Sequence, residues 1–94
     1  MAGMPAIQLL ESTHQFPGCY MFKVIGRSEQ GFVARVVAGV RDALAEEADP
    51  PFKVRETAGG RHVAVTLTPT VKNAQQVLDV YQRIQKMAGL VMVW

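Results

Sequence analysis

The chain has 94 residues, of which 49% are hydrophobic, and its formal net charge at pH 7 is +2. This length leaves room for one domain with one core, and the apolar content excludes an intrinsically disordered protein. The cationic excess is small and spread along the chain, whereas nucleic-acid-binding proteins concentrate their basic residues, so a nucleic-acid partner is not expected.

The same sequence indicates a cytoplasmic protein without a membrane partner. Its longest apolar run, Ala88 to Trp94, has the length of a strand and is far too short to span a bilayer. No basic segment followed by an apolar stretch opens the chain, so no signal peptide is expected. The single cysteine, Cys19, cannot form an intrachain disulfide, which fits a reducing compartment.

Residues 1–15 show no sustained hydrophobic period and contain Gly3 and Pro5. They are interpreted as a flexible N-terminal arm that precedes a single domain at residues 16–94. Three apolar side chains could dock this arm onto the domain: Ile7, Leu9 and Leu10.

The first strand and the first helix of the domain are expected between Tyr20 and Leu44. Residues 20–25 favour a strand except at Lys23, and Gly26 ends the run. Ser28 is a candidate N-cap for a helix that the prolines at 50–51 terminate. Its apolar residues recur at helical spacing and form one stripe: Phe32, Val33, Val36, Val37, Val40 and Leu44.

A hairpin follows, and its register can be derived. Gly59 and Gly60 suit a two-residue turn because glycine tolerates positive φ. This turn sorts both strands into an apolar and a polar face, as a sheet covered on one side requires. The expected pairs are Val54 with Val65 and Phe52 with Leu67 on one face, and Lys53 with Thr66, Arg55 with Ala64 and Thr57 with His62 on the other.

The C-terminal part predicts a second helix and a last strand. Thr70 or Asn73 can cap the helix, Gly89 ends it, and residues 90–94 form the strand. The helix carries one apolar stripe: Ala74, Val77, Leu78, Tyr81 and Ile84.

This order, strand–helix–strand–strand–helix–strand, predicts an α+β, ferredoxin-like fold. Each helix has one apolar stripe, so both can cover the same face of a four-stranded antiparallel sheet. Right-handed crossovers place the first strand beside the last and the third beside the second. With the strands numbered along the chain, the expected order is 4-1-3-2.

The uncovered face of this sheet should carry an apolar patch, because the first and last strands are apolar on both faces. We expect Met21, Ile25, Met92 and Trp94 to form an interface there. A second copy of the chain, the N-terminal arm or a partner protein could cover the patch. The alternative is a few tolerated apolar side chains at the surface.

Two groups of residues could bind an anion. The first is the cationic part of the open face, which contains Lys23, Lys53, Arg55 and His62. The second is the turn Gly26-Arg27-Ser28, where N–H groups at a helix N-terminus and a guanidinium suit a carboxylate. The alternatives are a solvated sheet face and an ordinary capped turn.

No catalytic or metal-binding constellation is recognisable. The two histidines, His14 and His62, and Cys19 lack metal-ligand spacing, and no nucleophile–base pair is supported beyond residue type. We therefore expect neither an enzyme nor a cofactor, and interpret Cys19 as a small buried hydrophobe. RNA binding is a minor hypothesis, because the outward positions 62, 64, 66 and 68 lack the aromatic residues that stack on bases.

Several segments resemble the YbeD-like family of small bacterial proteins, and the resemblance covers nearly the whole chain after about residue 9. They are Phe16-Pro17, the strand Tyr20-Met21-Phe22-Lys23-Val24-Ile25-Gly26, Phe32 with the valine-rich helix, residues 63–68, residues 76–81 and Val91-Met92-Val93-Trp94. The resemblance implies a ferredoxin-like fold similar to the ACT regulatory domains of metabolic enzymes. It implies no catalytic residues, and only Lys23 and Gly26 match the family motif as candidate ligand-side residues.

Members of that family have been proposed to be lipoic-acid-binding regulatory proteins. The resemblance thus implies a non-enzymatic, ACT-like module that binds a small anionic metabolite and acts as a homodimer or on a partner enzyme. The chain departs from its relatives at the hairpin tip, residues 56–61, so any function located there does not transfer. The alternative is a protein–protein adaptor that uses the open apolar sheet face.

Overall fold

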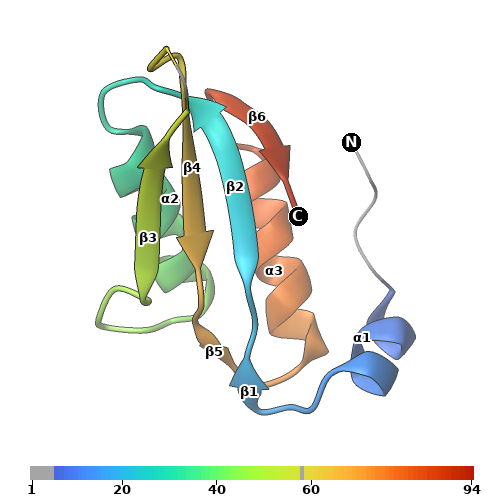
Figure 1. The fold of residues 1–94 in the computed structure, drawn as a ribbon. Coiled ribbons are helices and arrows are strands. Elements are labelled where there is room, and N and C mark those ends of the chain that lie inside the picture. The colour runs from blue at the N-terminus through green and yellow to red at the C-terminus, as the bar shows by residue number, and fades with distance from the viewer. Residues whose placement is uncertain (1–5, 58) are drawn as a thin grey trace.

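The computed structural model in Figure 1 describes residues 6–57 and 59–94. Four strands form an antiparallel sheet in the order β3-β4-β2-β6, and β1 pairs with β5 in a separate two-stranded sheet. This is the predicted order 4-1-3-2, so the ferredoxin-like fold is confirmed. The elements are α1 (Ile7–Thr13), β1 (Gly18–Cys19), β2 (Phe22–Arg27), α2 (Phe32–Ala43), β3 (Phe52–Glu56), β4 (His62–Leu67), β5 (Thr70–Val71), α3 (Ala74–Gln85) and β6 (Leu90–Val93).

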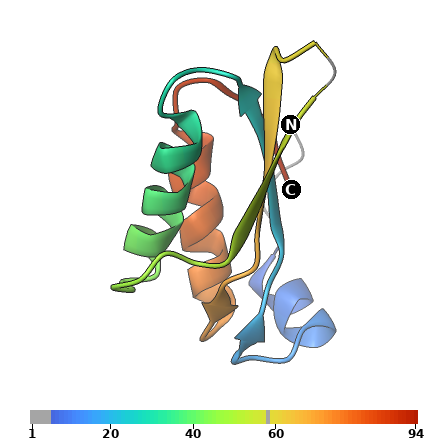
Figure 2. The ribbon, with the colours of Figure 1, turned by 60° about the vertical axis from the view of Figure 1, so that its left-hand side comes forward.

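Helices α2 and α3 lie side by side on one face of the four-stranded sheet and leave its other face uncovered (Figure 2). The core lies between these two layers because each helix turns its apolar stripe toward the sheet. The stripe predicted for α3 is shifted slightly: Val80 is fully buried, whereas Leu78 is only partly buried. The side chains with the least exposure are Phe22, Phe32, Leu10, Leu67, Ile84, Val24, Val36, Val40, Val65, Val71, Val77 and Val80.

The predicted hairpin register is confirmed at every pair that the ladder contains. Strand β3 pairs with β4 from Phe52–Leu67 to Glu56–Val63, and the N–H of Thr57 donates to the carbonyl of His62 at 3.0 Å. Gly59 and Gly60 have φ of +85° and +68°, the region that glycine enters without strain.

The burial of β3 differs from the expectation. Phe52 and Val54 lie on the apolar face of the ribbon, but they are 43% and 46% exposed. All five residues of β3 are exposed, because the strand lies at the edge of the sheet and α2 does not cover it completely. An apolar strand edge is therefore left at the surface.

The segment expected to be a flexible arm contains helix α1, which lies at the end of the molecule where β1 and β5 pair (Figure 1). One of its three candidate docking residues, Leu10, is buried in the core, whereas Leu9 and Ile7 are exposed. Residues 7–13 thus form a helix although they show no sustained hydrophobic period, and the flexibility of the arm stays a prediction. Gly3 and Pro5, on which it partly rested, lie outside the described residues.

Two short strands extend the fold beyond the predicted elements. Gly18 pairs with Val71 and Cys19 with Thr70 in the two-stranded sheet of β1 and β5. Cys19 is exposed, so its interpretation as a buried hydrophobe is wrong. The first main strand also continues two residues further than expected, to Arg27, so Gly26 lies inside it.

One predicted helix cap is wrong and one is confirmed. Helix α2 begins at Phe32 after Gly31, which has a φ of +84° and provides no side-chain cap, so Ser28 is not its N-cap. In α3 the Oδ1 atom of Asn73 accepts the N–H of Gln76 at 3.0 Å, as expected for an N-cap.

Gly26 is required where β2 meets α2. It is buried, and a Cβ atom at this position would overlap Cζ and both Cε atoms of the fully buried Phe32 ring. The ring therefore packs directly on the backbone of β2. This contact explains the glycine of the strand motif by packing rather than by ligand binding.

Leu10→Ala should lower the free energy of unfolding by about 2 kcal/mol or more, because it removes a side chain that is only 2% exposed. Leu9→Ala in the same helix is the matched control, since Leu9 is 56% exposed, and should change stability by less than about 0.5 kcal/mol. Urea unfolding of both variants measures the difference. Equal, small effects would show that α1 is not docked.

Gly26→Ala should destabilise the protein by about 2 kcal/mol or more, because the new methyl group overlaps the Phe32 ring. Phe32→Leu removes the ring atoms that are in the way. The double variant Gly26→Ala/Phe32→Leu should therefore be more stable than the sum of the two single effects. Additive effects in thermal unfolding would refute the packing explanation.

Candidate functional site

The open face of the sheet is built from side chains that alternate with the buried ones along each strand. Lys23 and Trp94 exchange two backbone hydrogen bonds, of 2.7 and 2.9 Å, which places the indole beside the ammonium group at the start of β2. The register then aligns the side chains in rows across the strands. These rows are Trp94–Lys23–Thr66–Lys53, Met92–Ile25–Ala64–Arg55 and Arg27–His62–Thr57.

A shallow depression of about 570 Å³ lies on the first two rows. Its lining combines cations with apolar groups and contains no carboxylate side chain. The residues that line it are Lys23, Val24, Ile25, Lys53, Val54, Arg55, Ala64, Val65, Thr66 and Trp94.

The cations of this depression are not neutralised by the protein. In residues 6–57 and 59–94 the ion pairs are Arg35–Glu29, Arg41–Asp42 and Arg41–Asp49, and none involves Lys23, Lys53 or Arg55. Lys23 and Lys53 flank Thr66 from the two neighbouring strands, and adjacent strands lie about 4.8 Å apart. A carboxylate above Thr66 would therefore lie within reach of both ammonium groups.

The predicted apolar patch lies beside the cations. Met92 and Trp94 are about half exposed, and Ile25, which pairs with Met92, is partly buried. Met21, directly before β2, is about half exposed as well. The face is therefore amphipathic, with apolar side chains toward β6, cations on β3, and both kinds on β2.

A bulge places one apolar residue of β6 against the core. The pairing of β2 with β6 shifts between Ile25 and Gly26, so Leu90 lies opposite Gly26 and packs against the core. Val91, Met92 and Trp94 are the exposed apolar residues of β6 and its C-terminal end, and the strand pairing places Met92 and Trp94 in the rows of the open face.

His62 and Arg27 lie opposite each other in the third row, outside the residues that line the depression. They extend the cationic face toward the hairpin turn. Of the four cationic residues predicted to share this face, Lys23, Lys53 and Arg55 line one depression and His62 lies at its margin.

The turn Gly26-Arg27-Ser28 does not offer free backbone N–H groups to an anion. The N–H of Arg27 donates to Gly89 at 2.8 Å, and that of Ser28 donates to Arg61 at 2.9 Å. The basis for an anion site at a helix N-terminus is therefore absent here, because α2 begins four residues later.

Sequence reasoning missed an aromatic cluster that joins α1 to the domain. Tyr20 lies 4.9 Å from His14 and 4.9 Å from Phe22, measured between ring centroids, and Phe22 lies 5.1 Å from Tyr81. The hydroxyls of Tyr20 and Tyr81 lie 3.4 Å apart. Burial and this contact raise the pKa of Tyr81, so the phenol stays neutral at physiological pH. The cluster is thus a packing feature.

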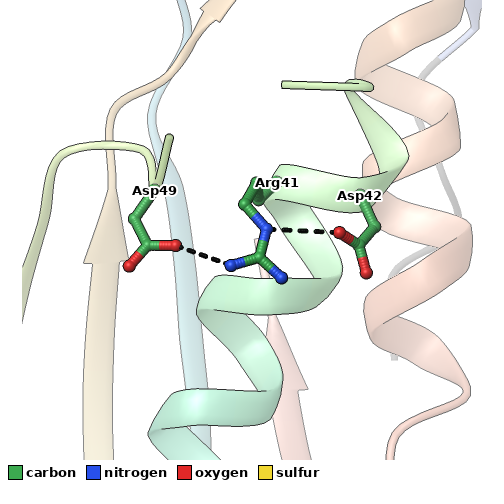
Figure 3. Close-up of polar contacts among 3 residues, drawn as sticks. All are labelled: Arg41, Asp42 and Asp49. Atoms are coloured by element: carbon green, nitrogen blue, oxygen red, sulfur yellow. Dashed lines mark hydrogen bonds and ion pairs between the residues drawn. The ribbon is translucent and has the colours of Figure 1, made fainter. Parts of the chain in front are cut away.

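One of the acidic residues after α2, Asp49, forms an ion pair with Arg41 (Figure 3). Arg41 donates from Nε to Asp42 at 3.2 Å and from Nη1 to Asp49 at 3.0 Å, and these carboxylates raise the pKa of Arg41. The second contact connects the end of α2 to the loop that leads into β3.

Within the described residues, no three His, Cys, Asp or Glu side chains cluster as metal ligands. No helix in that same part of the chain has the length and apolar content to cross a membrane.

Relatives of this chain were found by sequence and by fold. Residues 11–94 match a family described as a protein of unknown function, DUF493. A UPF0250 protein of Chromobacterium violaceum is 31% identical over 67 residues, which cover 71% of this chain and 75% of that protein. UPF0250 proteins of Nitrosomonas europaea and Paraburkholderia phytofirmans are each 27% identical over 74 residues, covering 79% of this chain and 85% and 83% of theirs.

A solution structure of HP0495 from Helicobacter pylori has a similar fold, with a TM-score of 0.64 and 14% sequence identity, over 100% of this chain and 98% of that one. A second solution structure of HP0495 gives a TM-score of 0.55 with 15% identity over 84% and 87% of the chains. These likenesses concern the fold. Together with the family match over residues 11–94, they show that the chain belongs to DUF493, the YbeD-like family of small bacterial proteins whose function is not established.

Proposed function

We propose that the protein is a non-enzymatic, ACT-like regulatory module that senses a small carboxylate metabolite with an apolar body, with lipoate as the leading candidate. The observation that carries this proposal is the depression on the open face. It places Lys23, Lys53 and Arg55 beside Ile25 and Trp94, without an Asp or Glu side chain in its lining.

The two sides of the depression suit the two ends of such a ligand. A carboxylate over Thr66 would receive charge-assisted hydrogen bonds from Lys23 and Lys53. The hydrocarbon part would then extend over Ile25 and the Trp94 indole. The volume, about 570 Å³, is in the range of small-molecule sites, but the face is open, so one side of the ligand stays in water and the affinity should be modest.

The composition of the lining favours binding over catalysis. Lysine, arginine, threonine and tryptophan side chains line the depression, and none of these residue types has an ordinary pKa near neutrality for proton transfer. His62 lies in the neighbouring row and outside the lining. Regulation would follow if ligand binding changes the surface that a partner enzyme contacts.

Lipoate titrated into 15N-labelled protein should shift the backbone amides of Lys23, Ala64 and Thr66 and the Trp94 indole N–H, because these groups surround the depression. Lipoamide, which lacks the charge, should bind at least about tenfold more weakly. Lys23→Glu should abolish the shifts because it replaces a carboxylate-binding cation by a carboxylate.

Lys72→Glu is the matched control for that titration. It makes the same change in net charge at an exposed position outside the depression, so it should leave lipoate binding nearly unchanged. Equal losses of lipoate binding in both variants would show that binding depends only on the overall charge of the protein. The absence of shifts at the highest soluble lipoate concentration would reject the site for this ligand.

A second candidate function is a protein–protein adaptor, and the half-exposed Met21, Met92 and Trp94 favour it. Exposed apolar side chains that cluster on one sheet face are typical of interfaces. In its simplest form, two copies of the chain cover each other's patch and form a homodimer.

Light scattering should then detect a concentration-dependent dimer, and Met92→Ala/Trp94→Ala should shift it to monomer. Leu9→Ala, which truncates an equally exposed residue on α1, should leave the dimer intact. Adding lipoate distinguishes the metabolite site from the dimer interface. A dimer that buries this face should dissociate as lipoate occupies the depression. A monomer at all concentrations would contradict the homodimer.

A further inference from the structure

Strand β3 is a free sheet edge of regular geometry. It pairs with β4 over five residues without a shift in register, and among residues 6–57 and 59–94 no strand pairs with its other side. The opposite edge, β6, is four residues long, and its pairing with β2 contains an irregularity. A regular, exposed edge is the better template for an added strand, so β3 is the edge to consider.

The hydrogen bonds at both ends of the hairpin show which backbone groups of β3 face outward. Thr57 donates to His62, and Thr68 donates to Pro51, so residues 51 and 57 turn their polar groups toward β4. These groups alternate in direction along an antiparallel strand. The N–H and C=O groups of Phe52, Val54 and Glu56 therefore point away from β4, and Val54 lies at the centre of this free edge.

The two faces of the edge differ in chemistry. On the helix side, Phe52 and Val54 are nearly half exposed, and Phe52 borders an apolar depression of about 570 Å³ against α2. It is lined by Val33, Ala34, Val37, Ala38, Arg41, Asp49 and Phe52. Its one carboxylate, Asp49, is held by Arg41 at 3.0 Å. On the open side, Lys53 and Arg55 form no ion pair within the described chain.

This charge pattern disfavours a second copy of the same strand. Symmetric antiparallel pairing centred on Val54 would place Lys53 opposite Arg55 of the other copy, twice in one interface. It would also place Phe52 opposite Glu56 on the helix side. Like charges directly opposite each other destabilise a strand pair, so the edge is unfavourable for self-pairing.

We propose that the β3 edge binds an extended segment of another protein in which acidic and apolar residues alternate. The segment adds a fifth strand to the sheet. Its acidic side chains pair with Lys53 and Arg55, and its apolar side chains cover Val54 and Phe52. At the Glu56 end, a basic residue completes the match. This goes beyond the metabolite site, because it assigns a protein partner to the backbone edge of β3, which shares Lys53 and Arg55 with that site.

A designed heptapeptide with blocked ends, Thr-Lys-Glu-Val-Glu-Val-Thr, places these residue types opposite Thr57 through Pro51 in antiparallel register. Titrated into 15N-labelled protein, it should slow hydrogen exchange at the amides of Phe52, Val54 and Glu56. The amides of Lys53 and Arg55, which already bond to β4, should change little in exchange rate. The charge-reversed peptide, Thr-Glu-Lys-Val-Lys-Val-Thr, should not bind.

Substitutions at Val54 test the backbone pairing, and a double substitution at Lys53 and Arg55 tests the charges. Val54→Pro removes an outward N–H without breaking a bond to β4 and should weaken the peptide at least about tenfold, whereas Val54→Thr keeps the N–H and should bind within about threefold. Lys53→Glu/Arg55→Glu should reverse the preference between the two peptides. This pair of surface changes tests the proposal even if the proline variant fails to fold.

Three results would overturn the proposal. The first is the absence of protection at residues 52, 54 and 56 at millimolar peptide. The second is protection of those amides without peptide that grows with protein concentration, which assigns the edge to a second copy. The third is a set of shifts confined to Lys23, Ile25 and Trp94, which shows that the peptide acts as a simple carboxylate. Lipoate binding to the unsubstituted protein without peptide, measured in parallel, reports separately on the metabolite site.

Discussion

The packing of the Phe32 ring on the backbone of Gly26 is the contact on which the arrangement of the molecule depends. It places the first turn of α2 directly against the central strand β2, and no side chain at position 26 could separate the two. With α2 seated there and α3 beside it, both helices cover the same face of the sheet. The side chains of the proposed binding surfaces therefore lie on the other face and at the β3 edge, where α2 and α3 do not block a ligand or a partner.

The hairpin could be predicted from sequence because its determinants are local. Two glycines with positive φ and the alternation of apolar and polar residues define the register, and the cationic face of Lys53 and Arg55 follows from it. The order of the strands could also be predicted from sequence. Two helices with one apolar stripe each are compatible with few strand orders that have right-handed crossovers. The register thus also predicts that Lys53 and Arg55 lie on the face that the helices leave uncovered.

The errors arose where tertiary contacts outweigh local signals. Ser28 has the side chain of an N-cap, but its N–H donates to the Arg61 carbonyl, and the helix begins only at Phe32, after a turn at Gln30 and Gly31. Helix α1 has no strong hydrophobic period, and its docking depends mainly on one buried residue, Leu10. Local residue preferences predict none of these features.

Lys53 and Arg55 belong to both proposed surfaces, and this has a mechanistic consequence. The same two cations line the open depression and form the charged side of the β3 edge. A carboxylate ligand in the depression lowers the positive potential that an acidic segment at the edge would experience, so the two occupants should bind with negative coupling. By linkage, each then weakens the other by the same factor. A metabolite could thus release a partner protein without any change in backbone conformation, because the shared cations are the coupling element.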